Sequence, residues 1–166
     1  MPTASTERAR LRGAGGRGLA GLLLIAATLG AGLAPGVADT PSPADPDDPA
    51  QVARGARVYS EACAACHGAA LEGQPDWQTP NPDGTLPAPP HDAEGHTWHH
   101  ADGLLFRYTK LGGAVLFKDL PGVESAMPGF GEVLSDKDIW DVLAFIKTHW
   151  PEEMRAYQHA ASANEK

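Results

Sequence analysis

Five residues, Cys63-Ala64-Ala65-Cys66-His67, decide how the rest of this sequence is interpreted. A C-x-x-C-H run is typical of a covalent haem attachment site. On a helix the two thiols lie one turn apart, where they can bond the two vinyl groups of one haem, and the adjacent imidazole then lies beneath the iron. Because the chain has only 2 cysteines, this use leaves no thiol for a disulfide or a zinc site.

Two other interpretations of the cysteine pair are weaker. A redox-active dithiol is expected beside a βαβ pattern, whereas the residues around this pair look helical or rich in Gly and Pro. A zinc site needs two further ligands at suitable spacing. Histidines between residues 91 and 100 could supply nitrogens, but the chain has no second cysteine pair.

The first 38 residues have the layout of a secretory signal peptide, with arginines first, an apolar stretch over residues 19–33, and small residues up to Ala38. The apolar stretch of 15 residues is short against the roughly 20 that span a bilayer. We therefore expect cleavage after Ala38, or after Ala34, and a periplasmic or otherwise exported protein. An uncleaved membrane anchor is the alternative, because the flanking small residues lengthen the span.

Composition divides the chain into four segments: the signal peptide or anchor (1–38), a Pro/Asp-rich linker (39–49), a folded domain (50–157) and a polar tail (158–166). The linker cannot bury a core and is expected to be extended and mobile. Residues 39–166 hold 9 basic and 20 acidic side chains, a formal net charge of −11. A chain this acidic is a poor candidate for binding nucleic acid or anionic lipid.

Apolar periodicity predicts helices and no sheet. A first helix is expected from Asp48, as its N-cap, with Pro49 at the first helical position. Its apolar face carries residues 52, 56, 59 and 63, so the helix would deliver Cys63 to the cofactor. No alternating strand pattern and no internal repeat are present.

Two more helices are expected further along the chain. One begins with Asp102 as its N-cap, carries Leu104, Leu105, Tyr108 and Leu111, and ends at the glycines 112 and 113. The other begins with an approximate capping box at residues 135 and 138 and is closed or kinked by Pro151. The segment 68–95 is too rich in Pro and Gly for long regular structure. A loop this long is usually functional, and wrapping a large flat cofactor would explain it.

Met127 is the candidate for the second axial ligand of the iron. Of the 3 methionines, Met1 leaves with the signal peptide and Met154 follows Pro151 in a polar segment. Met127 stands in the rigid sequence Met127-Pro128-Gly129-Phe130, between the second and third predicted helices. The alternative role for this thioether is that of a soft filler of the core.

These features together resemble the class I cytochromes c over about residues 50–150. The resemblance is carried by the C-x-x-C-H motif, the Pro-rich loop, Met127-Pro128-Gly129, two residues of the first helix and three of the last: Gly55, Tyr59, Trp140, Phe145 and Ile146. It implies an all-α fold of three main helices and long loops around one haem c.

The resemblance also implies the roles of single residues. One haem would be bonded to Cys63 and Cys66, with His67 and Met127 as the axial ligands of its iron. Gly55 and Tyr59 would pack against Phe145, and a loop proline, Pro89 as first choice, would accept the hydrogen bond from Nδ1 of His67. Such a bond orients the imidazole and strengthens it as a ligand.

A His/Met pair raises the reduction potential of the iron, and filling both axial positions leaves substrates no easy route to it. The sequence therefore predicts a single-electron carrier and not an enzyme. The acidic chain predicts redox partners that dock through a basic patch, with rates that fall as salt rises.

The segment HDAEGHTWHH departs from the pattern of small cytochromes. Its histidines and Trp98 could bond to haem propionates and backbone, could form a copper or zinc site, or could replace Met127 with a histidine ligand. Two alternative functions follow: a haem protein with a labile sixth ligand, peroxidase-like or sensory, and a copper-handling module. The four histidines concerned are His91, His96, His99 and His100.

Overall fold

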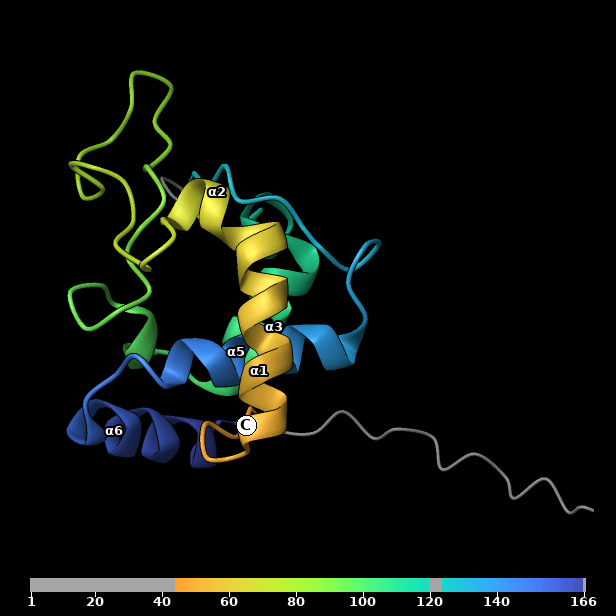
Figure 1. Cartoon of the computed structure of the whole chain (residues 1–166). Helices are drawn as coiled ribbons and strands as arrows, with labels where there is room; N and C mark the ends of the chain where they lie inside the picture. Colours follow the sequence, from red (N-terminus) through yellow and green to blue (C-terminus); the bar gives the residue numbers. More distant parts are fainter. Residues whose placement is uncertain (1–43, 120–123, 166) are drawn as a thin grey trace, which may run out of the picture. The chain divides into compact units, whose positions relative to one another are not determined.

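The computed structural model describes residues 44–119 and 124–165. The predicted signal peptide and residues 39–43 of the predicted linker lie outside this part of the chain. All regular structure in the described residues is helical (Figure 1). In chain order the elements are α1 (Pro49–Val58), a π-helical turn (Tyr59–Cys63), α2 (Ala64–His67), a 3₁₀ turn (Thr97–His99), α3 (Asp102–Leu111), α4 (Gly113–Leu116), α5 (Asp136–Lys147) and α6 (Glu152–Ala163).

The starts of α1 and α5 agree with the sequence. Asp48 caps α1, where its carboxylate accepts a hydrogen bond from the Ala50 N–H at 2.8 Å, and Pro49 is the first helical residue. A complete capping box starts α5: the Ser135 side chain accepts from the Asp138 N–H, and the Asp138 carboxylate accepts from the Ser135 N–H at 3.0 Å. Both signals are local, because donor and acceptor lie within three residues of each other.

The expected start of the second helix is wrong by one residue. Ala101 is the N-cap of α3, and Asp102 is its first helical residue. The carboxylate of Asp102 instead accepts hydrogen bonds from the Lys147 ammonium and the Gln158 amide, each at 2.7 Å. Its partners therefore come from distant helices, which a local capping pattern does not reveal. Leu111, placed on the apolar face by the sequence, is 44% exposed at the helix end.

The core forms where α1 crosses α5 (Figure 1). Gly55 makes the crossing close, since a Cβ atom at this position would overlap the backbone carbonyl of Asp141 and the side chain of Phe145. Tyr59, one turn further along, is 2% exposed and lies against Phe145 with ring centroids 5.4 Å apart. The packing of Gly55 and Tyr59 against Phe145 is as the family resemblance implied. Apolar residues of α5 are buried to 4% exposure or less at five positions: Ile139, Val142, Leu143, Ala144 and Ile146.

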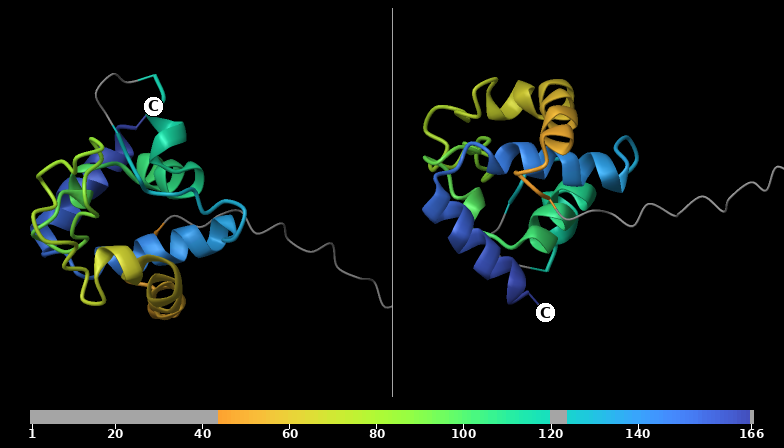
Figure 2. Two further views of the ribbon diagram at one scale, coloured as in Figure 1. Left: turned by 90° about the horizontal axis from the view of Figure 1, so that it is seen from above. Right: turned by 60° about the horizontal axis from the view of Figure 1, so that its bottom comes forward.

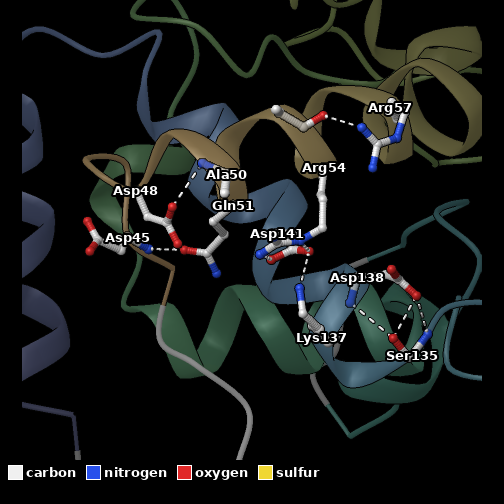
Figure 3. A network of polar contacts seen from close by, with 11 residues as sticks. Asp45, Asp48, Ala50, Gln51, Arg54, Arg57, Ser135, Lys137, Asp138 and Asp141 are labelled. Carbon is white, nitrogen blue, oxygen red and sulfur yellow. Dashed lines mark hydrogen bonds and ion pairs between the residues drawn. The ribbon is translucent and has the colours of Figure 1, made fainter. Parts of the chain in front are cut away.

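A buried carboxylate reinforces the same crossing (Figure 3). Asp141 is 1% exposed and accepts hydrogen bonds from Nε of Arg54 at 2.6 Å and from Nζ of Lys137 at 2.7 Å. Burial alone would raise the pKa of Asp141, but the hydrogen bonds from Arg54 and Lys137 outweigh it and leave the pKa lowered. The ion pair with Arg54 joins α1 to α5.

Both ends of the described chain are more ordered than the sequence suggests. Ala44, in the predicted mobile linker, is 6% exposed, and its carbonyl accepts a hydrogen bond from Lys147 at 3.1 Å. Residues 152–163, part of which was expected to be a polar tail, form α6, which follows α5 after a turn (Figure 2). Pro151 is the N-cap of this additional helix, while α5 already ends at Lys147.

Helix α6 is fixed by polar contacts to the start of α3. Gln158 is 2% exposed and bonds to Asp102. Ser162 Oγ accepts from the Asp102 N–H at 3.0 Å, and a Glu165 carboxylate oxygen accepts from the Gly103 N–H at 2.8 Å. These partners are polar and lie about sixty residues apart in the chain, so apolar periodicity does not predict this helix.

We predict that Gly55→Ala destabilises the protein although alanine favours helices. The new methyl group must displace backbone of α5, and overpacking of this kind costs about 1–3 kcal/mol, more than the gain of about 1 kcal/mol in helix propensity. Chemical denaturation of the holoprotein measures the free energy of unfolding. The control is Ala53→Ser on the exposed side of α1, which should change it by less than about 0.5 kcal/mol. A Gly55→Ala protein as stable as wild type contradicts the close crossing.

We predict a pH-dependent loss of stability from Asp141. Because its pKa is lowered by folding, its contribution is present above the unfolded pKa of about 3.9 and is lost as the pH falls through the lower folded value. Asp141→Asn should cost about 1–3 kcal/mol at pH 7 and less at pH 3. Denaturation curves of both proteins at the two pH values check this, and an equal difference at both would contradict it.

Candidate functional site

The segment that carries both cysteines is formed by a change of helix type. Helix α1 passes into the π-helical turn Tyr59–Cys63 and then into α2, which ends at Gly68 with φ 84°. A π turn inserts one extra residue per turn and commonly marks functional sites. Here the π turn ends at Cys63, the first cysteine of the motif, and Cys66 and His67 lie on the short helix α2 that follows.

Neither cysteine forms a disulfide, and their thiols differ in environment. Cys63 is half-buried and Cys66 is exposed. Burial, with a smaller effect of the Cys66 charge, raises the pKa of Cys63 to about 11. A reactive dithiol needs a cysteine pKa lowered toward or below neutrality. The site therefore gives no support to the redox-dithiol interpretation.

The imidazole of His67 is held with one nitrogen engaged and the other available. His67 is 7% exposed, and its Nδ1 lies 2.8 Å from the carbonyl oxygen of Pro89. Burial lowers the pKa of His67, partly offset by this hydrogen bond, so the neutral ring with Nδ1–H donating is favoured. No residue of the described chain hydrogen-bonds to Nε2. This tautomer leaves the Nε2 lone pair free, as a metal-ligating histidine requires.

The long loop puts the Pro89 carbonyl in place. Gly73, at φ 69°, lies so close to Pro89 and Pro90 that a Cβ atom would be 2.5 Å from the Pro90 nitrogen. Two backbone hydrogen bonds tie the loop, from the Gln74 N–H to the Ala88 carbonyl at 2.9 Å and from the Gly73 N–H to the His67 carbonyl at 2.8 Å. The Pro-rich segment therefore returns to the motif from which it starts.

Tyr59 contacts the motif through its backbone. The hydroxyl donates to the Gly68 carbonyl at 2.9 Å and lies 3.3 Å from the His67 carbonyl oxygen. The structure thus brings Tyr59, His67 and Pro89 together. Tyr59 thereby holds the end of α2 against the buried α1–α5 crossing.

The segment with Met127 is bound to the C-terminal end of α3. Three backbone hydrogen bonds hold it: the Met127 carbonyl accepts from Gly113 at 3.1 Å, and the N–H groups of Phe130 and Gly131 donate to α3 carbonyls at 2.9 and 3.0 Å. The Met127 side chain is half-buried. In the part of the chain that the structure describes, no hydrogen bond or ring contact joins Met127 to His67, so its role as a ligand stays a prediction.

Two of the histidines in residues 91–100 stack on tryptophan rings, and His100 lies edge-on to His96 with centroids 5.4 Å apart. His96 stacks on Trp77, with centroids 5.4 Å apart, and His99 stacks on Trp98 at 3.6 Å. Over residues 44–119 and 124–165, no three His, Cys, Asp or Glu side chains are arranged to hold a metal ion. The proposed copper or zinc site therefore finds no support there. The indole N–H of Trp98 donates to the backbone at Gly95.

Sequence reasoning missed the contact that His91 makes. Its ring stacks on that of His67, with centroids 3.9 Å apart. The available signal was its position, because His91 follows the Pro89-Pro90 pair that was expected to reach the ligand histidine.

A family model described as Cytochrome c matches residues 52–150. The chain belongs to the cytochrome c family. The all-α class I cytochrome c fold expected from the sequence is confirmed. No curated protein and no solved structure matches the chain.

Cytochromes c bind haem covalently, and the residues of this chain fit that cofactor. Two free thiols three residues apart, Cys63 at the end of the π turn and Cys66 in α2, suit two thioether bonds. The available Nε2 of His67 suits an axial ligand. Cytochrome c domains are typically exported. None of the helices in the described residues is long and apolar enough to cross a membrane.

Proposed function

We propose that this cytochrome c is a monohaem carrier of single electrons between exported or membrane redox partners. The single observation that carries the proposal is the His67 imidazole, buried beside the two thiols, tied at Nδ1 by Pro89 and available at Nε2. The chain has one C-x-x-C-H motif and no further cysteine, which supports one haem. Residues 1–38 would direct its export to the periplasm.

When bound, haem c supplies an Fe(III)/Fe(II) couple that exchanges one electron. The residues of the chain hold this couple in one geometry: Cys63 and Cys66 tether it, and Pro89 holds His67 in the ligating tautomer. Met127 would complete the coordination from the loop bound to α3. A site whose ligands do not change between redox states needs little reorganisation, which favours fast transfer over substrate chemistry.

The charge of the protein supports a basic partner. Of the eight Lys and Arg side chains in the described residues, five form ion pairs with carboxylates. This leaves few cations to offset the excess of acidic groups, and haem propionates add further negative charge. A partner with a basic patch around its own redox centre would be attracted by this field.

We predict that Met127→Ala changes the coordination of the iron. The purified holoprotein should carry the mass of one haem and show low-spin haem c bands, with a weak far-red band in the oxidised form. In Met127→Ala the far-red band should disappear and the iron should bind cyanide readily. Met154→Ala is the matched control, because this methionine packs against the core in α6, and its spectrum should be that of wild type. An unaltered Met127→Ala spectrum rules out Met127 as the ligand.

We predict that electron transfer depends on salt with the sign set by the acidic surface. The reduced protein should be oxidised by the cationic tris(phenanthroline)cobalt(III) complex at a rate that falls severalfold as salt rises from about 10 to 300 mM, since screening weakens the attraction. With anionic ferricyanide the rate should rise instead. Stopped-flow absorbance measures both, and the opposite signs, or no salt dependence with either oxidant, would contradict electrostatic docking.

A further inference from the structure

His91 covers one face of the imidazole that is expected to bind iron. The rings of His67 and His91 stack with centroids 3.9 Å apart and planes inclined by 21°. Only Pro90 separates His91 from Pro89, whose carbonyl accepts the hydrogen bond from His67. Two residues of one short segment therefore contact His67, Pro89 at its Nδ1 edge and His91 at one of its faces.

His91 is itself fixed at three points, two on its backbone and one on its ring. Its backbone N–H donates to the Leu71 carbonyl at 2.8 Å, and its carbonyl accepts from Nε1 of Trp150 at 2.8 Å. Its Nδ1 lies 2.9 Å from Oγ1 of Thr97, which is 6% exposed. Leu71 and Trp150 are buried in the core, at 1% and 3% exposure. The ring cannot leave His67 without breaking at least one of these contacts.

The two contacts with His67 constrain different motions. A hydrogen bond at Nδ1 fixes the position of that edge, but the ring can still rotate about the line that joins Nδ1 to the acceptor. A flat ring at van der Waals distance from the imidazole blocks this rotation, because turning the imidazole would drive one edge into its neighbour. Pro89 and His91 together therefore define both the direction and the plane of the ring.

We propose that His91 is a positioning residue that fixes the plane of the His67 imidazole as an axial ligand and shields that ligand from water. The inference rests on the proposed function, since it takes His67 to ligate the iron. The plane of an axial imidazole determines how unpaired spin is distributed over the ferric porphyrin, and the shell around a ligand controls solvent access and hence the reduction potential.

The test compares His91→Ala with His91→Phe in the holoprotein. In His91→Ala the four haem-methyl proton shifts of the ferric protein should be redistributed, and the reduction potential should fall as water reaches the ligand. His91→Phe restores a flat ring, so its methyl pattern should return to that of wild type. His99→Ala is the matched control: His99 is exposed and stacks on Trp98, and this substitution should leave both quantities unchanged.

A second variant guards against a loss of folding in His91→Ala. Thr97→Val keeps the His91 ring and removes its hydroxyl anchor, so the methyl shifts should move in the same direction by a smaller amount. Wild-type shifts and potential in His91→Ala overturn the inference. If His91→Ala does not accumulate, wild-type shifts in Thr97→Val overturn it. A methyl pattern in His91→Phe as altered as that of His91→Ala also overturns it, because stacking is then not the cause.

These outcomes separate the inference from the proposed function. If the wild-type holoprotein has low-spin haem c and His91→Ala has the shifts and potential of wild type, the proposed function stands and the inference is overturned. A wild-type protein that lacks haem c, or whose iron is not bound by histidine, overturns both.

Discussion

The close approach of α1 and α5 at Gly55 is the contact on which the rest of the structure depends. From this contact, α1 continues through the π-helical turn to the two thiols and His67. The chain that follows α5 reaches Trp150, whose indole N–H donates to the backbone carbonyl of His91. The distance between these helices therefore sets how the cysteine-bearing turn meets the loop that holds His67. Glycine is needed because any side chain at this crossing would overlap the partner backbone.

Features coded within a few residues were predictable from the sequence. The capping of α1 by Asp48 and the capping box at Ser135 and Asp138 were correct, since each joins groups in one turn of chain. Features made by distant polar groups were not. Asp102 was expected to cap α3, and its true partners, Lys147 and Gln158, come from α5 and α6. Helix α6 was missed for the same reason.

The candidate site shows the same division. The hydrogen bond between His67 and Pro89 was expected from the family resemblance, and the structure contains it. The stack of His91 on His67 was not expected, because periodicity does not distinguish four nearby histidines, and the place of His91 directly after Pro89-Pro90 was not used. Met127 is a different case. A thioether makes no hydrogen bond that would reveal its partner, so only its setting, bound to the end of α3, supports the assignment.

The position of α6 links the end of the chain to its interior. Helix α3 has no side-chain cap of its own at Ala101, and its first N–H groups are satisfied by Ser162 and Glu165. The last turn of a chain is usually the first part to fray. Here, fraying would also expose the unpaired N–H groups of a second helix. The two helices are therefore coupled into one cooperative unit, and amide protons near the C-terminus share in the protection of the core.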